Sequence, residues 1–97
     1  MDTREFNVLH LLAHTYLVNA RPAKAAAVLA ALDALQPGCE RVLAGLALAQ
    51  LRCGDALQAL QTLERLRARG DGGMPVELMR QRALRAAATS VATGASA

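Results

Sequence analysis

Apolar residues recur along this chain at the spacing of an α-helix. Leucines and alanines fall three or four positions apart within residues 4–18, 22–35, 39–52 and 55–69, and this spacing gathers side chains on one helix face. Residues that start or end helices separate these stretches, and they are Asn19-Ala20-Arg21-Pro22, Gln36-Pro37-Gly38, Cys53-Gly54-Asp55 and Gly70-Asp71-Gly72-Gly73. Proline at the first helical position and aspartate at an N-cap favour a helix start. The pattern therefore predicts four helices joined by short turns.

The C-terminal part of the chain predicts one further helix, from Pro75 to Ala88. Residues 89–97 read TSVATGASA, and such small side chains cannot bury enough surface to offset the cost of ordering. We therefore expect a flexible tail over residues 89–97. A chain of 97 residues leaves room for one domain, so residues 1–88 are expected to form a single helical domain.

The expected core faces follow from the leucine spacing on the second and fourth helices. The predicted stripe on the second helix consists of Ala25, Val28, Leu29, Leu32 and Leu35. The predicted stripe on the fourth consists of Leu57, Leu60, Leu63 and Leu66, with Ala56 and Ala59 beside it. Helices of this length are marginal in water by themselves, so packing must stabilise them. Short connections make successive helices antiparallel neighbours.

Composition supports an all-α fold. Alanine and leucine are the main apolar residue types, and isoleucine is absent. Alanine and leucine are the best apolar helix formers, whereas strands favour β-branched and aromatic residues. With 54% hydrophobic residues and a net charge of +3, the chain does not have the composition of a disordered protein.

The chain contains an internal repeat. Shifting the sequence by 34 aligns Leu9 with Leu43, Leu12 with Leu46, Ala13 with Ala47, Ala20 with Gly54, Ala25 with Ala59, Leu29 with Leu63 and Leu32 with Leu66. Each unit then consists of two helices with a break between them. A period in this range is the mark of a repeat architecture, in which stacked units share one core.

The repeat resembles the tetratricopeptide repeat (TPR), a helical hairpin of about 34 residues. The first unit matches the family pattern at Leu9, Leu12, Ala13, Tyr16, Ala20, Ala25, Leu29, Leu32 and Pro37. The second unit matches at Leu43, Leu46, Ala47, Gly54, Ala59, Leu63 and Leu66. It departs from the pattern at Gln50, where tyrosine is expected, and at Asp71, where proline is expected. The resemblance covers about residues 6–71.

The resemblance implies a short α-solenoid of two TPR-like antiparallel helical hairpins plus a C-terminal capping helix. A further shift by the same period would place Glu77 and Arg80 at core positions, so residues 75–88 fit a cap better than a third repeat. Repeat arrays usually need about three units and polar caps, so the chain is short for its class. A generic alanine- and leucine-rich helical bundle is the alternative fold.

The sequence also resembles the YscY-type chaperones of bacterial type III secretion systems. The stretches VLHLLAHTYLVNARPAKAAAVLAALDALQPG and LAQLRCGDALQALQTLERL carry this likeness. It implies a cytoplasmic chaperone that stabilises a small export component or substrate and docks at the export gate of the inner membrane. The needle-subunit and translocator chaperones are sister classes that stay open. The alternative function is a generic TPR adaptor or a structural subunit of another bacterial complex.

The TPR resemblance implies that the first helix of each hairpin lines a partner-binding groove. From the first hairpin the groove residues are Asn7, His10, His14, Leu17 and Val18. From the second they are Arg41, Ala44, Leu48, Leu51 and Arg52. An apolar groove suits an amphipathic helix or an extended apolar segment, and an empty groove favours self-association. The alternative is that these leucines belong only to the core.

The sequence gives no sign of catalytic, cofactor or metal chemistry. His10 and His14 share a helix face, but no third zinc ligand is evident. No nucleophile–base set and no phosphate-binding loop can be assembled, so we expect neither an enzyme nor a cofactor. The arginines of the C-terminal half lack neighbouring aromatic residues, which argues against a nucleic-acid partner. No apolar run is long enough to span a bilayer, and the expected location is the bacterial cytoplasm.

Overall fold

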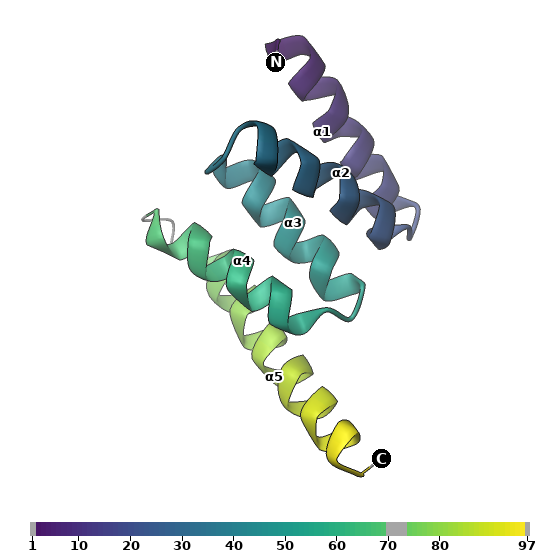
Figure 1. Cartoon of the computed structure of the whole chain (residues 1–97), viewed down its shortest axis with the longest axis vertical. Helices are drawn as coiled ribbons and strands as arrows, with labels where there is room; N and C mark the ends of the chain where they lie inside the picture. The colour runs from purple at the N-terminus through teal and green to yellow at the C-terminus, as the bar shows by residue number, and fades with distance from the viewer. Residues whose placement is uncertain (1, 70–73, 97) are drawn as a thin grey trace.

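The computed structural model describes residues 2–69 and 74–96, and within them it consists of helices and turns. Figure 1 shows the helices, which are α1 (Thr3–Val18), α2 (Pro22–Leu35), α3 (Glu40–Arg52), α4 (Ala56–Ala68) and α5 (Met74–Ser96). The predicted all-α class is confirmed. The expected break at Gly70-Asp71-Gly72-Gly73 lies outside the described residues.

The first four helices begin and end within one residue of their predicted bounds, because the sequence signals at their ends act locally. The Asp2 carboxylate accepts a hydrogen bond from the Arg4 amide at 3.3 Å, and the Asp55 carboxylate accepts one from the Gln58 amide at 3.4 Å. Each satisfies an amide at a helix start that has no partner within the helix. Proline occupies the first position of α2.

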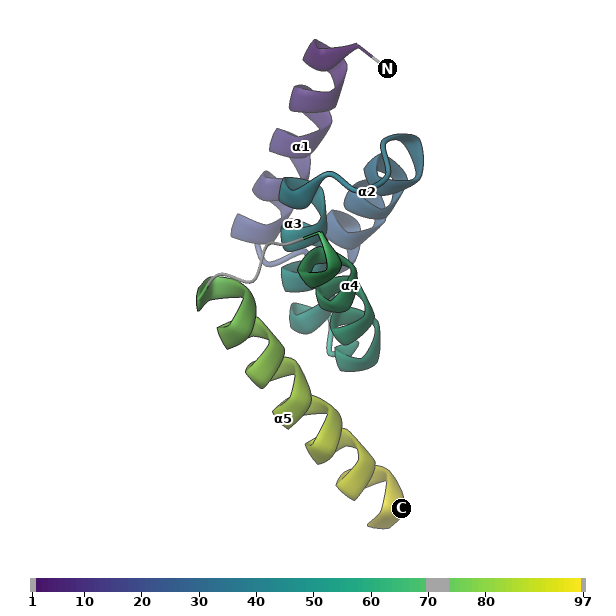
Figure 2. The same cartoon turned by 90° about the vertical axis from the view of Figure 1, so that its left-hand side faces the viewer.

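The fifth helix is longer than the sequence suggested, since α5 continues to Ser96 rather than ending at Ala88. Alanine supports helical backbone even without burial, and alanines recur through residues 86–95. The end of α5 extends past the other helices in Figures 1 and 2. The flexibility of this segment stays a prediction, and Ala97 lies outside the described residues.

Each helix packs against the next one along the chain, and α3 also contacts both α1 and α5. α1 contacts α3 and α3 contacts α5, whereas no Cα atoms of α2 and α4 approach within 8 Å. Figure 2 shows the consequence: α1 and the start of α5 lie to one side of α3, away from α2 and α4. The helices form a layered stack measuring 48 × 29 × 20 Å. Among the described residues, no helix combines the length and apolar character needed to cross a membrane.

Two clusters of buried side chains hold the stack together, and α3 contributes to both. The first cluster joins α1, α2 and α3 and contains Phe6, Ala13, Leu17, Ala25, Leu29, Leu32, Val42, Leu46 and Ala49. The second joins α3, α4 and α5 and contains Leu43, Ala47, Ala59, Leu63, Leu66 and Ala83. Because α3 is covered from both sides, it is the central element of the molecule.

Each predicted core stripe contains buried residues, but one terminal leucine of each stripe is exposed. Ala25, Leu29 and Leu32 are buried, but Leu35 is 61% exposed. On α4, Leu63 and Leu66 are buried, but Leu57 is 66% exposed. Three residues advance an α-helix by about 300°, so each step of three rotates a stripe by about 60°. A run of such steps therefore leaves the contact face after a few turns.

The turns within the two hairpins have the same hydrogen bonds at equivalent positions of the repeat. In the first turn, the amide of Ala20 donates to the Leu17 carbonyl at 3.2 Å and that of Arg21 to the Tyr16 carbonyl at 2.8 Å. In the second, the amide of Gly54 donates to the Leu51 carbonyl at 3.1 Å and that of Asp55 to the Gln50 carbonyl at 2.9 Å. Both turns have the hydrogen bonds of a Schellman motif.

The motif requires a left-handed backbone at its centre, which is supplied by Ala20 with φ of 58° and by Gly54 with φ of 81°. Alanine is strained in this conformation and glycine is not. We therefore expect Ala20→Gly to raise the free energy of unfolding by about 0.5–1 kcal/mol and Gly54→Ala to lower it by about the same amount. Urea unfolding of the two variants checks this, and equal signs for both would contradict it.

Equivalent positions of the two hairpins are also linked by side chains, although the chemistry differs. In the first hairpin, Lys24 Nζ lies 5.9 Å from the centroid of the Tyr16 ring. At the same two positions of the second hairpin, Gln50 Nε2 donates to Gln58 Oε1 at 3.4 Å, and Thr62 donates to Gln50 Oε1 at 2.7 Å. Gln50, where the TPR pattern expects tyrosine, thus ties α3 to α4 through hydrogen bonds.

Candidate functional site

A hollow between α1 and α3 brings together four of the residues predicted to bind a partner. It has a volume of about 430 Å³ and is lined by Asn7, His10, Leu11, His14 and Arg41. His10 and Leu11 follow Asn7 by three and four residues, and His14 follows them by four and three, so successive helical turns present all four on one face. Arg41 reaches the hollow from the first turn of α3.

His10 forms the most enclosed part of this hollow. Its ring stacks on Phe6 with centroids 6.3 Å apart and an interplanar angle of 17°. Its Nε2 atom is buried and has no hydrogen-bond partner among the described residues. A buried polar atom without a partner costs about 1–3 kcal/mol. A bound group that supplied the missing hydrogen bond would remove that cost.

The chemistry of the lining residues favours acidic or amide groups next to apolar ones. None of the five residues is acidic, and the Asn7 amide, the two imidazoles and the Arg41 guanidinium can all donate hydrogen bonds. Leu11 is 65% exposed beside them. The hollow therefore combines hydrogen-bond donors with an apolar side chain, as a protein-binding site does.

The other residues predicted on α3 have a mixed environment. Ala44, Leu48 and Leu51 are half-buried. Leu48 packs against the first buried cluster, and Ala44 and Leu51 pack against the second. Aspartate at Leu48 or Leu51 would place a charge in the predicted groove. Because both leucines support the core, such a change would also lower stability and is unsuitable as a test of binding.

The structure corrects the prediction for Leu17 and gives Arg52 a structural contact. Leu17 is only 7% exposed and belongs to the first buried cluster, because it follows the buried Ala13 by four residues and shares its face. Arg52 Nη1 donates to the Leu17 carbonyl at 3.2 Å, so it joins the end of α1 to the end of α3. Val18 is 69% exposed.

Leu11 is the lining residue that sequence reasoning missed. It follows Asn7 by four residues and precedes His14 by three, so helical spacing alone could have placed it on their face. Nothing in the sequence indicated that Leu9 and Leu11, two residues apart, have different environments. Leu9 is half-buried against the first cluster, whereas Leu11 faces outward into the hollow.

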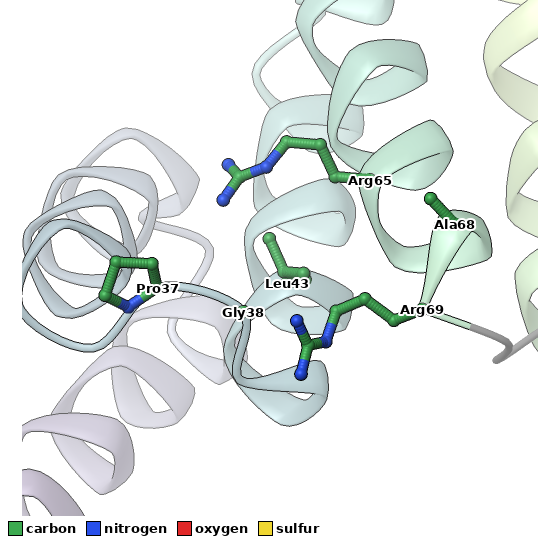
Figure 3. Close-up of a pocket in the computed structure, with 6 residues that line it drawn as sticks. All are labelled: Pro37, Gly38, Leu43, Arg65, Ala68 and Arg69. Carbon is green, nitrogen blue, oxygen red and sulfur yellow. The ribbon is translucent and has the colours of Figure 1, made fainter.

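A second hollow lies where α4 meets the turn between α2 and α3. Figure 3 shows its lining residues, Pro37, Gly38, Leu43, Arg65, Ala68 and Arg69, around a volume of about 320 Å³. A Cβ atom on Gly38 would lie 2.5 Å from Arg69 Nη1, so glycine there leaves room for the guanidinium. Arg69 therefore packs closely against the turn, and the hollow lies at the contact between the two hairpins.

Arg65, which lines this hollow, forms an ion pair that connects α4 to α2. Its guanidinium donates two hydrogen bonds to the Asp33 carboxylate, at 2.7 and 3.0 Å. These hydrogen bonds hold the pKa of Asp33 below its ordinary value and raise that of Arg65. Asp33 lies in the last turn of α2, where the helix dipole disfavours a carboxylate, and Arg65 compensates for this.

The basic residues of α5 differ from one another in their environment. Arg80 is half-buried, and its guanidinium lies 3.5 Å from both the Glu64 and the Glu77 carboxylates. Arg82 and Arg85 are exposed. Arg80 therefore takes part in the contact between α4 and α5, which leaves two exposed arginines on this helix.

The two histidines do not form part of a larger ligand set in the described part of the chain, where no three His, Cys, Asp or Glu side chains come together.

Comparison with known proteins adds no relative. The chain matches no protein-family model, no curated protein and no solved structure.

Proposed function

We propose that this protein is a small TPR-like chaperone that holds a segment of a partner protein against α1 and α3. The observation that carries the proposal is the recurrence of the hairpin at the period of the sequence repeat. α2 begins at Pro22 and α4 begins at Ala56, which is the equivalent position of the second unit. Each hydrogen bond of the first hairpin turn recurs at the equivalent position of the second turn.

The order of helices in the stack supports a binding role. In stacked helical hairpins, each unit contacts its neighbours, and one row of helices provides an extended binding surface. Here α1 and α3 touch each other and together line the hollow of Asn7, His10, Leu11, His14 and Arg41. A partner that crosses this surface would contact both hairpins.

The chemistry of the hollow defines the segment that it would hold. An amphipathic helix or an extended apolar segment could cover Leu11 and the half-buried Leu48 and Leu51. An acidic residue on the same segment could accept hydrogen bonds from Arg41 and His14. Hydrogen bonds to charged groups are stronger than those between neutral ones, about 1.5–3 kcal/mol each. We infer no catalytic step and no cofactor at this site.

The sequence resemblance gives the proposal its biological setting. The likeness to YscY-type chaperones suggests that the partner is a small export component or substrate of a bacterial type III secretion system. On this basis the protein works in the bacterial cytoplasm and docks at the export gate. Neither nucleic acid nor insertion into a membrane has a part in this function.

The test compares partner capture by the tagged wild-type chain and by a His14→Glu/Arg41→Glu variant in the native bacterium. The captured protein is identified by mass spectrometry, produced recombinantly and titrated against both chains. We expect the double variant to bind at least about tenfold more weakly, because it replaces donors with charges that repel an acidic ligand. Arg67→Glu/Arg82→Glu, which changes two exposed arginines outside the hollow, is the matched control.

Two results would contradict the proposal in different ways. Equal binding by wild type, variant and control would show that the hollow is not the binding site. A captured partner that belongs to no secretion apparatus, but still depends on His14 and Arg41, would leave the binding site intact and refute the secretion role. Circular dichroism of each variant separates a loss of binding from a loss of fold.

A further inference from the structure

The first helix has an unusual distribution of charge. Between Phe6 and Val18 it contains no Asp, Glu, Lys or Arg. A surface helix normally carries charged residues on the side away from the core. Yet, among the described helices, α1 packs only against α2 and α3. One side of this uncharged segment is therefore left open.

The open side carries a regular stripe of side chains, which we call the outer stripe. It consists of Val8, Leu11, Thr15 and Val18. These residues are spaced three, four and three apart, which is the spacing of a two-helix seam. Val8 is 60% exposed, and Leu11 and Val18 are more so. At 100° per residue the outer stripe lies opposite the buried Phe6, Ala13 and Leu17.

We propose that the outer stripe binds a second copy of this protein, with the two α1 helices antiparallel. The charges nearest to the uncharged segment support this arrangement. Glu5 precedes the segment, and Lys24 lies over the Tyr16 ring near its other end. Glu5 and Tyr16 are separated by about three helical turns, and so lie on the same side of α1.

The symmetry of a two-fold dimer brings these charges together. A two-fold axis that is perpendicular to both helices and to the line joining them makes the two copies of α1 antiparallel. The side of α1 that carries Glu5 and Tyr16 then faces the same side of the dimer in both copies. Glu5 of one copy therefore lies toward Lys24 of the other, and the pair occurs twice. A twofold interface uses the same patch on both copies, and one stripe with opposite charges at its two ends meets this requirement.

The size of the outer stripe sets the strength of the dimer. Four side chains on one helix cover much less than the roughly 800 Å² per partner of a standard stable interface. The dimer should therefore form with a dissociation constant of about 10–1000 µM. This interaction goes beyond the proposed chaperone function, because the outer stripe lies beside the hollow and shares with it only Leu11.

The first experiment is sedimentation equilibrium of the full chain from about 5 µM to 1 mM, a range that brackets this affinity. We expect a monomer–dimer equilibrium. Val8→Lys/Thr15→Lys adds two charges to each outer stripe and should weaken it at least about tenfold. Neither residue lines the partner-binding hollow. Leu35→Lys and Leu57→Lys alter equally exposed leucines on α2 and α4, and both should dimerise like the wild type.

A charge exchange tests the identity of the occupant. Glu5→Lys and Lys24→Glu should each weaken dimerisation about threefold to tenfold at low salt, since each creates two repulsive pairs. The double variant Glu5→Lys/Lys24→Glu should restore it, which only pairing between copies can explain. Circular dichroism of every variant checks that the chain stays helical.

Three outcomes would overturn the proposal. The first is a chain that stays monomeric up to about 1 mM, far above the expected dissociation constant. The second is a dimer that Val8→Lys/Thr15→Lys leaves unchanged, or one that the double charge exchange does not restore. The third is a monomeric chain whose captured partner is lost in Val8→Lys/Thr15→Lys, which would assign the outer stripe to that partner instead.

Discussion

Leu29→Asp is expected to abolish the cooperative fold. Leu29 is almost fully buried in the cluster that joins the first three helices. A Cβ atom on Gly45 would lie 3.3 Å from Leu29 Cδ1, so α2 and α3 are in close contact there. Burying an unpaired carboxylate costs several kcal/mol, and small domains are stable by only about 5–15 kcal/mol. The helical circular dichroism signal should be largely lost at 25 °C.

The matched control is Leu35→Asp, six residues later on the same helix. Leu35 is 61% exposed, so its carboxylate stays hydrated and the free energy of unfolding should change by less than about 1 kcal/mol. Urea titrations followed by circular dichroism measure both variants. A folded Leu29→Asp variant, or equal destabilisation by both changes, would show that α2 does not pack as described.

Ala25→Leu is expected to have the second largest effect. The Ala25 side chain is fully buried in the first cluster, where α1, α2 and α3 meet. Leucine adds three carbon atoms to a packed interior, and overpacking of this kind costs about 1–3 kcal/mol. At a contact between helices we expect the upper part of that range, a loss of about 3 kcal/mol. The melting temperature should fall by about 15 °C for a domain of this size.

Ala27→Leu serves as its control, because Ala27 lies two residues away on the same helix and is exposed. Leucine and alanine are both strong helix formers, so this change should shift the melting temperature by only about 2 °C. Thermal unfolding followed by circular dichroism compares the two variants. Equal stability of both would mean that the space around Ala25 is not closed.

The first four helices, their ends and the turns within the two hairpins could be read from the sequence because each depends on neighbouring residues. Pro22 starts α2, Asp55 caps α4 through the Gln58 amide, and the repeat aligns Ala20 with Gly54 at the left-handed position of the two turns. These interactions join residues that are close in sequence. Local backbone chemistry acts the same way whatever the rest of the chain does.

The candidate site was predicted in part. The resemblance to the TPR pattern placed Asn7, His10, His14 and Arg41 in one groove, and helical spacing placed His10 and His14 on one face of α1. The prediction failed at Leu17, which turns into the core. Spacing defines which side chains share a face, but the direction of that face depends on where the neighbouring helices lie.

Only the tertiary structure decided which apolar residues are buried. α2 is apolar nearly all round, with Lys24 and Asp33 as its only charged residues, so its sequence predicted the buried Leu29 but did not exclude the exposed Leu35. In the folded chain Leu29 and Ala25 are buried, whereas Leu35 and Ala27 are exposed. The outer stripe of α1 is exposed as well. The sequence determined helices, turns and period through local interactions. The positions of α1 and α3 then selected the buried face, because hydrophobic burial has no direction until a second surface provides one.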